Sequence, residues 1–72
     1  MQDEWTRQAI GWVDGRNFEI DTAPGETGYL FRVRVEGFPV MQDHEVFDSA
    51  EAAKEGAVAF LGKQFQAKVN LE

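Results

Sequence analysis

The stretch from Tyr29 to Glu36 constrains the fold more than any other part of the chain. Its side chains alternate, and four apolar ones share one face of an extended strand: Tyr29, Phe31, Val33 and Val35. The opposite face carries one apolar and three charged side chains: Leu30, Arg32, Arg34 and Glu36. Because such a strand buries one face and leaves the other to water, the pattern predicts an antiparallel sheet covered on one side only.

The pair Asp14-Gly15 is the second strong local signal. Both residue types tolerate the positive φ angles that a type I′ turn requires, and apolar residues alternate on either side of the pair. We therefore expect a hairpin formed by residues 8–13 and 16–22, with a short first strand.

Glycine and proline divide the remainder of the sheet region. The segment 22–28 predicts a loop, and residues 36–39 predict a turn. Residues 40–47 predict a further strand, although four polar residues at 42–45 interrupt its alternation. A bulge, an edge position or a loop within this segment would each explain the interruption.

A helix is predicted from about Ser49 to Phe65. The sequence Asp48-Ser49-Ala50-Glu51 is typical of a capping box, with Asp48 as the expected N-cap and Ser49 as its rival. Apolar residues then recur at helical spacing: Ala50, Ala53, Ala57, Phe60, Leu61 and Phe65. We expect this stripe to pack on the apolar face of the sheet. For residues 66–70, a last helical turn, a short strand and disorder all remain open.

Together these elements predict an α+β domain: an antiparallel three- to four-stranded sheet packed on one face by a single C-terminal α-helix. A chain of 72 residues has room for one small core, and 43% hydrophobic residues are enough to form it. We assign the domain to residues 1–70. Leu71-Glu72 are interpreted as the remnant of a cloning tag and are left out of the fold argument.

The charge and composition narrow the setting in which the protein works. Thirteen acidic and seven basic residues give a net charge of −6, which opposes general attraction to a phosphate backbone. No apolar run approaches the ~18 residues of a membrane span, and the first ten residues do not resemble a signal peptide. There is no cysteine. We expect an acidic cytoplasmic protein with no membrane association.

The chain offers few groups for catalysis or metal binding. His44 is the only histidine, and in a strand it would point away from its neighbours Asp43 and Glu45, so the three side chains would not converge. Glu19 and Asp21 share a strand face, which we interpret as a solvated charged face and not as a pair of catalytic carboxylates. We therefore expect no enzyme activity, no catalytic residues, no metal site and no cofactor.

Nucleic-acid binding is one function that the polar sheet face would allow. Its candidate contacts are Arg16, Arg32 and Arg34, in a sheet of the size that enters a major groove. Three acidic residues on the same face favour cross-strand ion pairs instead and would repel phosphate: Glu19, Asp21 and Glu36. Nucleic acid is therefore kept as an alternative and not as the expected partner.

Protein association is the other candidate function, because nine aromatic residues exceed what the predicted core accommodates. The candidate interface residues are Trp5, Trp12, Leu30, Phe38 and Phe65. Some of them would cover the ends of the small core, and others would form an exposed apolar patch of the kind found at interfaces. Such a patch, or an unpaired edge of the sheet, would allow the protein to form a homodimer or to bind another protein.

Residues 28–37 and 47–53 resemble a recurring bacterial pattern. In it, a strand of the form aromatic, x, aromatic, basic, aliphatic precedes a turn, a second strand and a helix that opens with Phe, polar, Ser/Thr, x, Glu, Ala, Ala. The pattern is found in small bacterial domains of unknown function, and its plan is distantly similar to the arm-type DNA-binding domains of tyrosine integrases. The resemblance implies a sheet-plus-helix fold in a bacterial protein and supplies no contact residues.

We therefore expect a non-catalytic binding or assembly module that acts between proteins, with self-association among its forms. The alternatives are a nucleic-acid-binding module and an accessory subunit of an enzyme complex.

Overall fold

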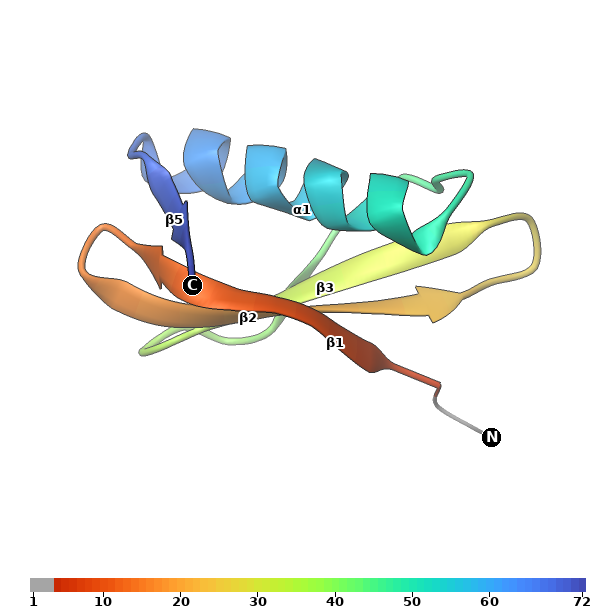
Figure 1. Ribbon diagram of the computed structural model, residues 1–72, viewed down its shortest axis with the longest axis horizontal. Helices are drawn as coiled ribbons and strands as arrows, with labels where there is room; N and C mark the ends of the chain where they lie inside the picture. The colour runs from red at the N-terminus through yellow and green to blue at the C-terminus, as the bar shows by residue number, and fades with distance from the viewer. Residues whose placement is uncertain (1–3) are drawn as a thin grey trace.

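The computed structural model of the protein describes residues 4–72, which form one five-stranded antiparallel sheet and one helix. The elements in chain order are β1 (Thr6–Val13), β2 (Arg16–Pro24), β3 (Tyr29–Val35), β4 (Met41–Gln42), α1 (Ala50–Phe65) and β5 (Val69–Leu71). The strand order across the sheet is β4-β3-β2-β1-β5. Figure 1 shows α1 lying along one face of the sheet, with the chain returning to the edge of β1 as β5. The α+β class is confirmed, and the sheet has five strands where three to four were predicted.

The β1–β2 hairpin turns at the predicted pair. Asp14 and Gly15 both have positive φ angles, 52° and 76°, and the flanking residues Val13 and Arg16 are cross-strand partners. The expectation of a short first strand is wrong, because β1 begins at Thr6 and has eight residues. An irregularity in the register between Arg7 and Ala9 shifts the alternation there, which hid this half of the strand from the sequence pattern.

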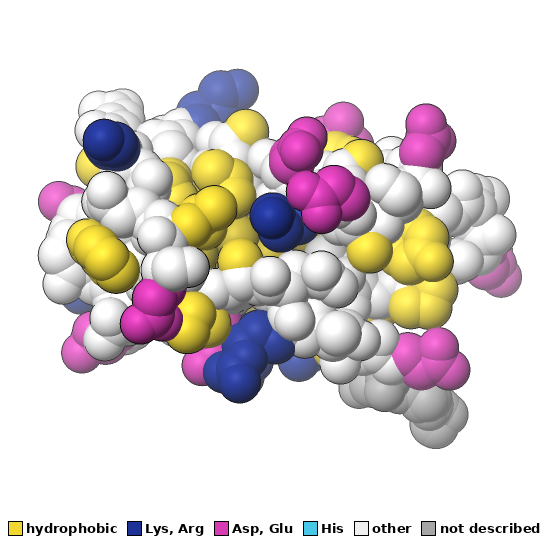
Figure 2. All heavy atoms as spheres, viewed as in Figure 1, with side chains coloured by type: hydrophobic (Ala, Val, Ile, Leu, Met, Phe, Trp, Pro, Cys, Tyr) yellow, Lys and Arg dark blue, Asp and Glu magenta, His cyan; other side chains and the backbone are white. Residues whose placement is uncertain are grey.

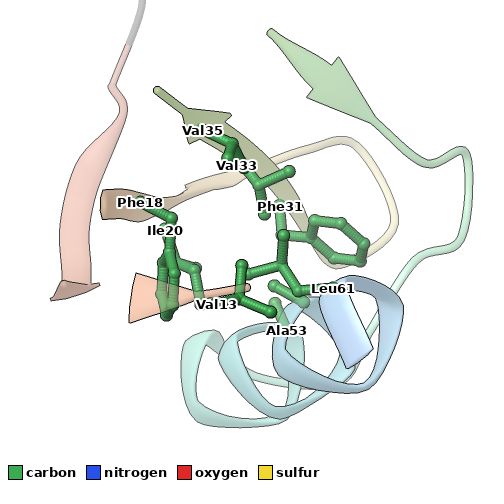
Figure 3. Close-up of a cluster of buried hydrophobic side chains, with 9 residues drawn as sticks. Val13, Phe18, Ile20, Phe31, Val33, Val35, Ala53 and Leu61 are labelled. Carbon is green, nitrogen blue, oxygen red and sulfur yellow. The ribbon is translucent and has the colours of Figure 1, made fainter. Parts of the chain in front are cut away.

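The core lies between α1 and the apolar faces of β1, β2 and β3. Its nine buried side chains are Val13, Phe18, Ile20, Phe31, Val33, Val35, Ala53, Ala57 and Leu61. Figure 3 shows the strand side chains pointing toward the helix. The predicted alternation of β3 is confirmed, since Phe31, Val33 and Val35 are buried. Tyr29 and Phe60 were also expected in the core and are only partly buried against it.

The start of α1 is capped by Ser49, and the prediction of Asp48 as N-cap is wrong. The Ser49 backbone is extended, and its hydroxyl accepts a hydrogen bond from the Ala52 amide at 3.1 Å. With Ser49 at the cap, the third helical residue is Ala52, so the reciprocal half of a capping box is missing. Glu51 instead pairs with Lys54 at 3.6 Å along the helix surface. The observed N-cap therefore lies one residue after the predicted one.

The predicted strand at residues 40–47 is reduced to the two residues of β4. The rest of the segment leaves the sheet and returns at Phe47, which exchanges backbone hydrogen bonds of 2.8 and 2.9 Å with Tyr29. The Phe47 ring lies between Phe31, at 5.9 Å between centroids, and Gly56 of α1. The packing of this ring connects the sheet with the helix.

The segment after α1 forms a short strand, which decides among the three alternatives for residues 66–70. Gln66 adopts a left-handed conformation with φ 51° and ends the helix. The chain then runs antiparallel to β1, with Leu71 opposite Gly11, and the Glu72 amide donates to the Ile10 carbonyl at 2.9 Å. Leu71 and Glu72 therefore take part in the sheet. Within residues 4–72, no helix combines the length and apolar character needed to cross a membrane.

Candidate functional site

The face of the sheet opposite α1, here called the open face, carries side chains in rows across the strands. Neighbouring strands lie about 4.8 Å apart, so residues paired in the register stand side by side. The row nearest the Asp14-Gly15 turn runs across β5, β1, β2 and the residue that follows β3: Asn70, Trp12, Asn17 and Glu36. The next row contains Ile10, Glu19 and Arg34, and the third contains Arg7, Asp21, Arg32 and Gln42.

The charged side chains of the second and third rows are paired with one another. Asp21 is only 2% exposed and contacts two guanidinium groups, Nε of Arg32 at 2.9 Å and Nη2 of Arg34 at 3.1 Å. Glu19 pairs with Arg34 and, at 3.7 Å, with Arg7. The expected cross-strand ion pairs are confirmed for Glu19 and Asp21, whereas Glu36 forms no salt bridge among residues 4–72. Because the positive charges of Arg32 and Arg34 are already compensated, these two candidate nucleic-acid contacts have less to offer a phosphate group.

At the far end of the open face, the side chain of Trp5 packs on Arg32. The guanidinium of Arg32 lies over the ring of Trp5 at 4.5 Å from its centroid. Leu30 is paired with Ala23 at this end, and both Leu30 and Trp5 are partly buried. Trp5 and Leu30, two of the predicted interface residues, are therefore partly covered within the chain.

Phe38 and Phe65, two more of the predicted interface residues, lie together with Arg16 beside the C-terminal end of α1. The Phe38 ring packs edge-on against Phe65, with centroids 5.1 Å apart and an interplanar angle of 84°. The Arg16 guanidinium lies over the Phe38 ring at 5.0 Å and donates to the Glu36 carbonyl at 3.4 Å. Arg16 is thus separated from Arg32 and Arg34, and the structure does not bring the three arginines onto one surface.

A depression with a volume of about 430 Å³ occupies the turn end of the open face. Its lining includes Ile10, Trp12, Asn17, Glu19 and Glu36, with Arg7 and Arg34 at its side. Trp12 is 46% exposed and Ile10 is 37% exposed. Of the five predicted interface residues, Trp12 is the one that lines this depression.

The sequence contained a signal for Ile10 that the prediction did not use. In a two-residue turn the flanking residues Val13 and Arg16 are partners, so Gly11 falls opposite Phe18. Trp12 and Ile10 must then point away from the buried Phe18. Counting pairs outward from the turn would have placed both side chains on the open face.

The acidic and histidine residues of the chain do not converge on a metal site in the part that the structure describes. No group of three or more His, Asp or Glu side chains is close enough there to hold an ion. His44 is exposed, and a second depression of about 360 Å³ includes Asp43, Glu45 and Lys63 in its lining without His44.

Comparison with known proteins finds no matching family model, no similar curated protein and no similar solved structure. The likeness to small bacterial domains and to arm-type integrase domains therefore stays a prediction.

Proposed function

We propose that the protein is a non-catalytic binding module that engages another polypeptide through the turn end of its open face. The observation that carries the proposal is the exposure of Trp12 and Ile10 on successive outward positions of β1, at the depression described above. An exposed aromatic and an aliphatic side chain surrounded by polar groups are typical of the centre of a protein interface. Tryptophan in particular contributes strongly to binding at such centres.

The two ends of the open face differ in a way that supports this choice. At the far end, Trp5 stacks on Arg32 and the carboxylate of Asp21 is buried. At the turn end, the indole of Trp12 has no such aromatic or cationic stacking partner among residues 4–72. The apolar surface that a partner would cover is therefore concentrated around Trp12.

The nucleic-acid alternative has weaker support. Arg32 and Arg34 are paired with Asp21 and Glu19, Arg16 lies elsewhere, and the chain carries a net charge of −6. If the bound partner is an enzyme, the protein would act as an accessory subunit of an enzyme complex. We place the module in the bacterial cytoplasm on sequence grounds alone.

Site-specific photo-crosslinking tests the proposal. A photoreactive amino acid replaces Asn17, which is exposed beside Trp12, or Glu55, which is exposed on α1 and serves as the control position. In cells that make the protein natively, we expect a discrete crosslinked product from position 17 that is absent from position 55. A product of twice the chain mass would identify a second copy as the partner. Identical product patterns from the two positions would contradict the proposal.

A further inference from the structure

We propose that the polypeptide segment bound at the turn end of the open face is basic, and that an arginine or lysine of this segment lies against Trp12 and pairs with Glu36. This inference rests on the proposed function and names the chemistry of the partner. It follows from the row of side chains at the turn and from the charges around it.

Trp12 on β1, Asn17 on β2 and Glu36, which directly follows β3, are neighbours in this row. Asn17 is the register partner of Trp12, and its carbonyl accepts from the Glu36 amide at 2.9 Å. The Glu36 carboxylate, in turn, accepts from the Asn17 amide at 3.4 Å and is therefore held on this row. The backbones of Trp12 and Glu36 are two strand spacings apart, about 10 Å, and the Glu36 carboxylate reaches back to the backbone of Asn17 between them. A cation placed over Asn17 would contact the indole face on one side and the carboxylate on the other.

One carboxylate in the depression, that of Glu36 just after β3, is not balanced by an ion pair. Glu19 is paired with Arg7 and Arg34, whereas Glu36 forms no salt bridge with any residue from 4 to 72. Glu72 also lines the depression. Figure 2 shows acidic side chains scattered over this view of the molecule with Lys and Arg side chains among them, and the chain as a whole carries a net charge of −6. This field attracts a basic segment and repels an acidic one.

The same charges argue against a second copy of the chain as the occupant. A second open face would present arginines that are already engaged: Arg7 with Glu19, Arg32 with Asp21, and Arg34 with both acids. It would also bring a second Glu36 toward the first. Two identical surfaces that each carry an unpaired carboxylate are poorly complementary.

Titration with short peptides, monitored by tryptophan fluorescence, tests the inference. Trp5→Phe keeps a ring against Arg32 and leaves Trp12 as the single tryptophan, so that emission reports on the depression. The probe is an eight-residue peptide of alternating arginine and threonine. Its counterparts replace arginine by glutamate or by glutamine. We expect a saturable change in Trp12 emission with the arginine peptide alone.

A matched pair of charge variants locates the binding. Glu36→Gln should weaken binding of the arginine peptide about three- to fivefold at ~50 mM salt, as expected for the loss of one exposed ion pair. Glu55→Gln removes the same charge from the exposed surface of α1 and should leave the affinity unchanged. Circular dichroism and the midpoint of thermal unfolding check that both variants fold.

Three results would overturn the inference. These are an equal loss of affinity in both charge variants, a response to the glutamine or glutamate peptide as strong as that to the arginine peptide, and a response to none of the peptides. Binding of a uridine oligonucleotide in place of the arginine peptide would overturn it as well. The crosslinking at Asn17 is independent of peptide charge, so a discrete product there combined with failure of the arginine peptide would refute the basic segment and leave the proposed function standing.

Discussion

Replacing Gly56 of α1 by alanine should fail to stabilise the protein, although the same change in an open helix adds about 1 kcal/mol. A Cβ at this position would overlap the ring of Phe47, with Cε2 only 2.6 Å away and Cε1 3.2 Å away. Forcing a methyl group into a packed contact costs about 1–3 kcal/mol. The two terms together predict a net loss of about 0–2 kcal/mol in the free energy of unfolding.

The ring of Phe47 has little freedom to move aside. Its backbone is fixed by two hydrogen bonds to Tyr29, and its ring packs against Phe31 at a centroid distance of 5.9 Å. A displacement that accommodates the new methyl group therefore disturbs either the bridge to β3 or the aromatic contact in the core. This is why we expect the packing cost to cancel or exceed the gain in helix propensity.

Denaturant unfolding of a double-mutant cycle separates the two effects. When Phe47→Ala has removed the ring, Gly56→Ala should stabilise the protein by about 1 kcal/mol, so the coupling energy is about 1–3 kcal/mol. Gly62→Ala is the matched control, because the nearest atoms to a Cβ there are 3.7 Å away. It should stabilise the wild-type chain by up to about 1 kcal/mol. If Gly56→Ala stabilises the chain equally with and without the Phe47 ring, the packing described here is wrong.

Three further predictions concern stability and are checked by the same unfolding measurements. Gly11→Ala would overlap the backbone carbonyl of Asn70 in β5, so we expect a loss of about 1–3 kcal/mol that disappears in a chain ending at residue 68. Ser49→Ala should cost about 1 kcal/mol and Asp48→Ala much less, since the Ser49 hydroxyl is the cap; equal costs would contradict this assignment. Asp21→Asn should lower the free energy of unfolding by about 2–3 kcal/mol. This loss is somewhat below the range for fully buried pairs, because the arginine partners of Asp21 are partly exposed. Glu19→Gln should lower the free energy of unfolding by less than about 1 kcal/mol.

Local chemistry made the first hairpin and β3 predictable from the sequence. The Asp14-Gly15 pair specifies its turn through backbone conformation alone, and the alternation from Tyr29 to Val35 needs no knowledge of distant residues. By contrast, β5 has only three residues, and its place beside β1 depends on Gly11, which is more than fifty positions earlier. Strands this short are defined by their partner and carry too little pattern of their own.

The prediction that a strand extends through residues 40–47 was wrong for a similar reason. This segment leaves β3 after Gln42 and rejoins it at Tyr29 through Phe47, whose ring occupies the space left by Gly56. That contact joins two parts of the chain whose proximity follows only from the assembled fold. The composition and alternation of residues 40–47 therefore could not predict this contact.

For the candidate site, the sequence identified Trp12 and the opposing charges of β2 and β3. It did not predict that Trp5 would stack on Arg32 beside a buried Asp21. Trp5 precedes β1 and belongs to no periodic pattern, so its position depends on tertiary contacts. The division of the open face into a covered end and an exposed end consequently became visible only in the structure.

Acrylamide quenching of the two tryptophans tests most directly the claim that the turn end of the open face is left uncovered. Trp5→Phe isolates the emission of Trp12, and Trp12→Phe isolates that of Trp5, which is partly buried against Arg32. We predict that Trp12 is quenched more strongly than Trp5 and emits at longer wavelength, and that neither difference changes on dilution. A Trp12 that is as well protected as Trp5 at every protein concentration would contradict the account.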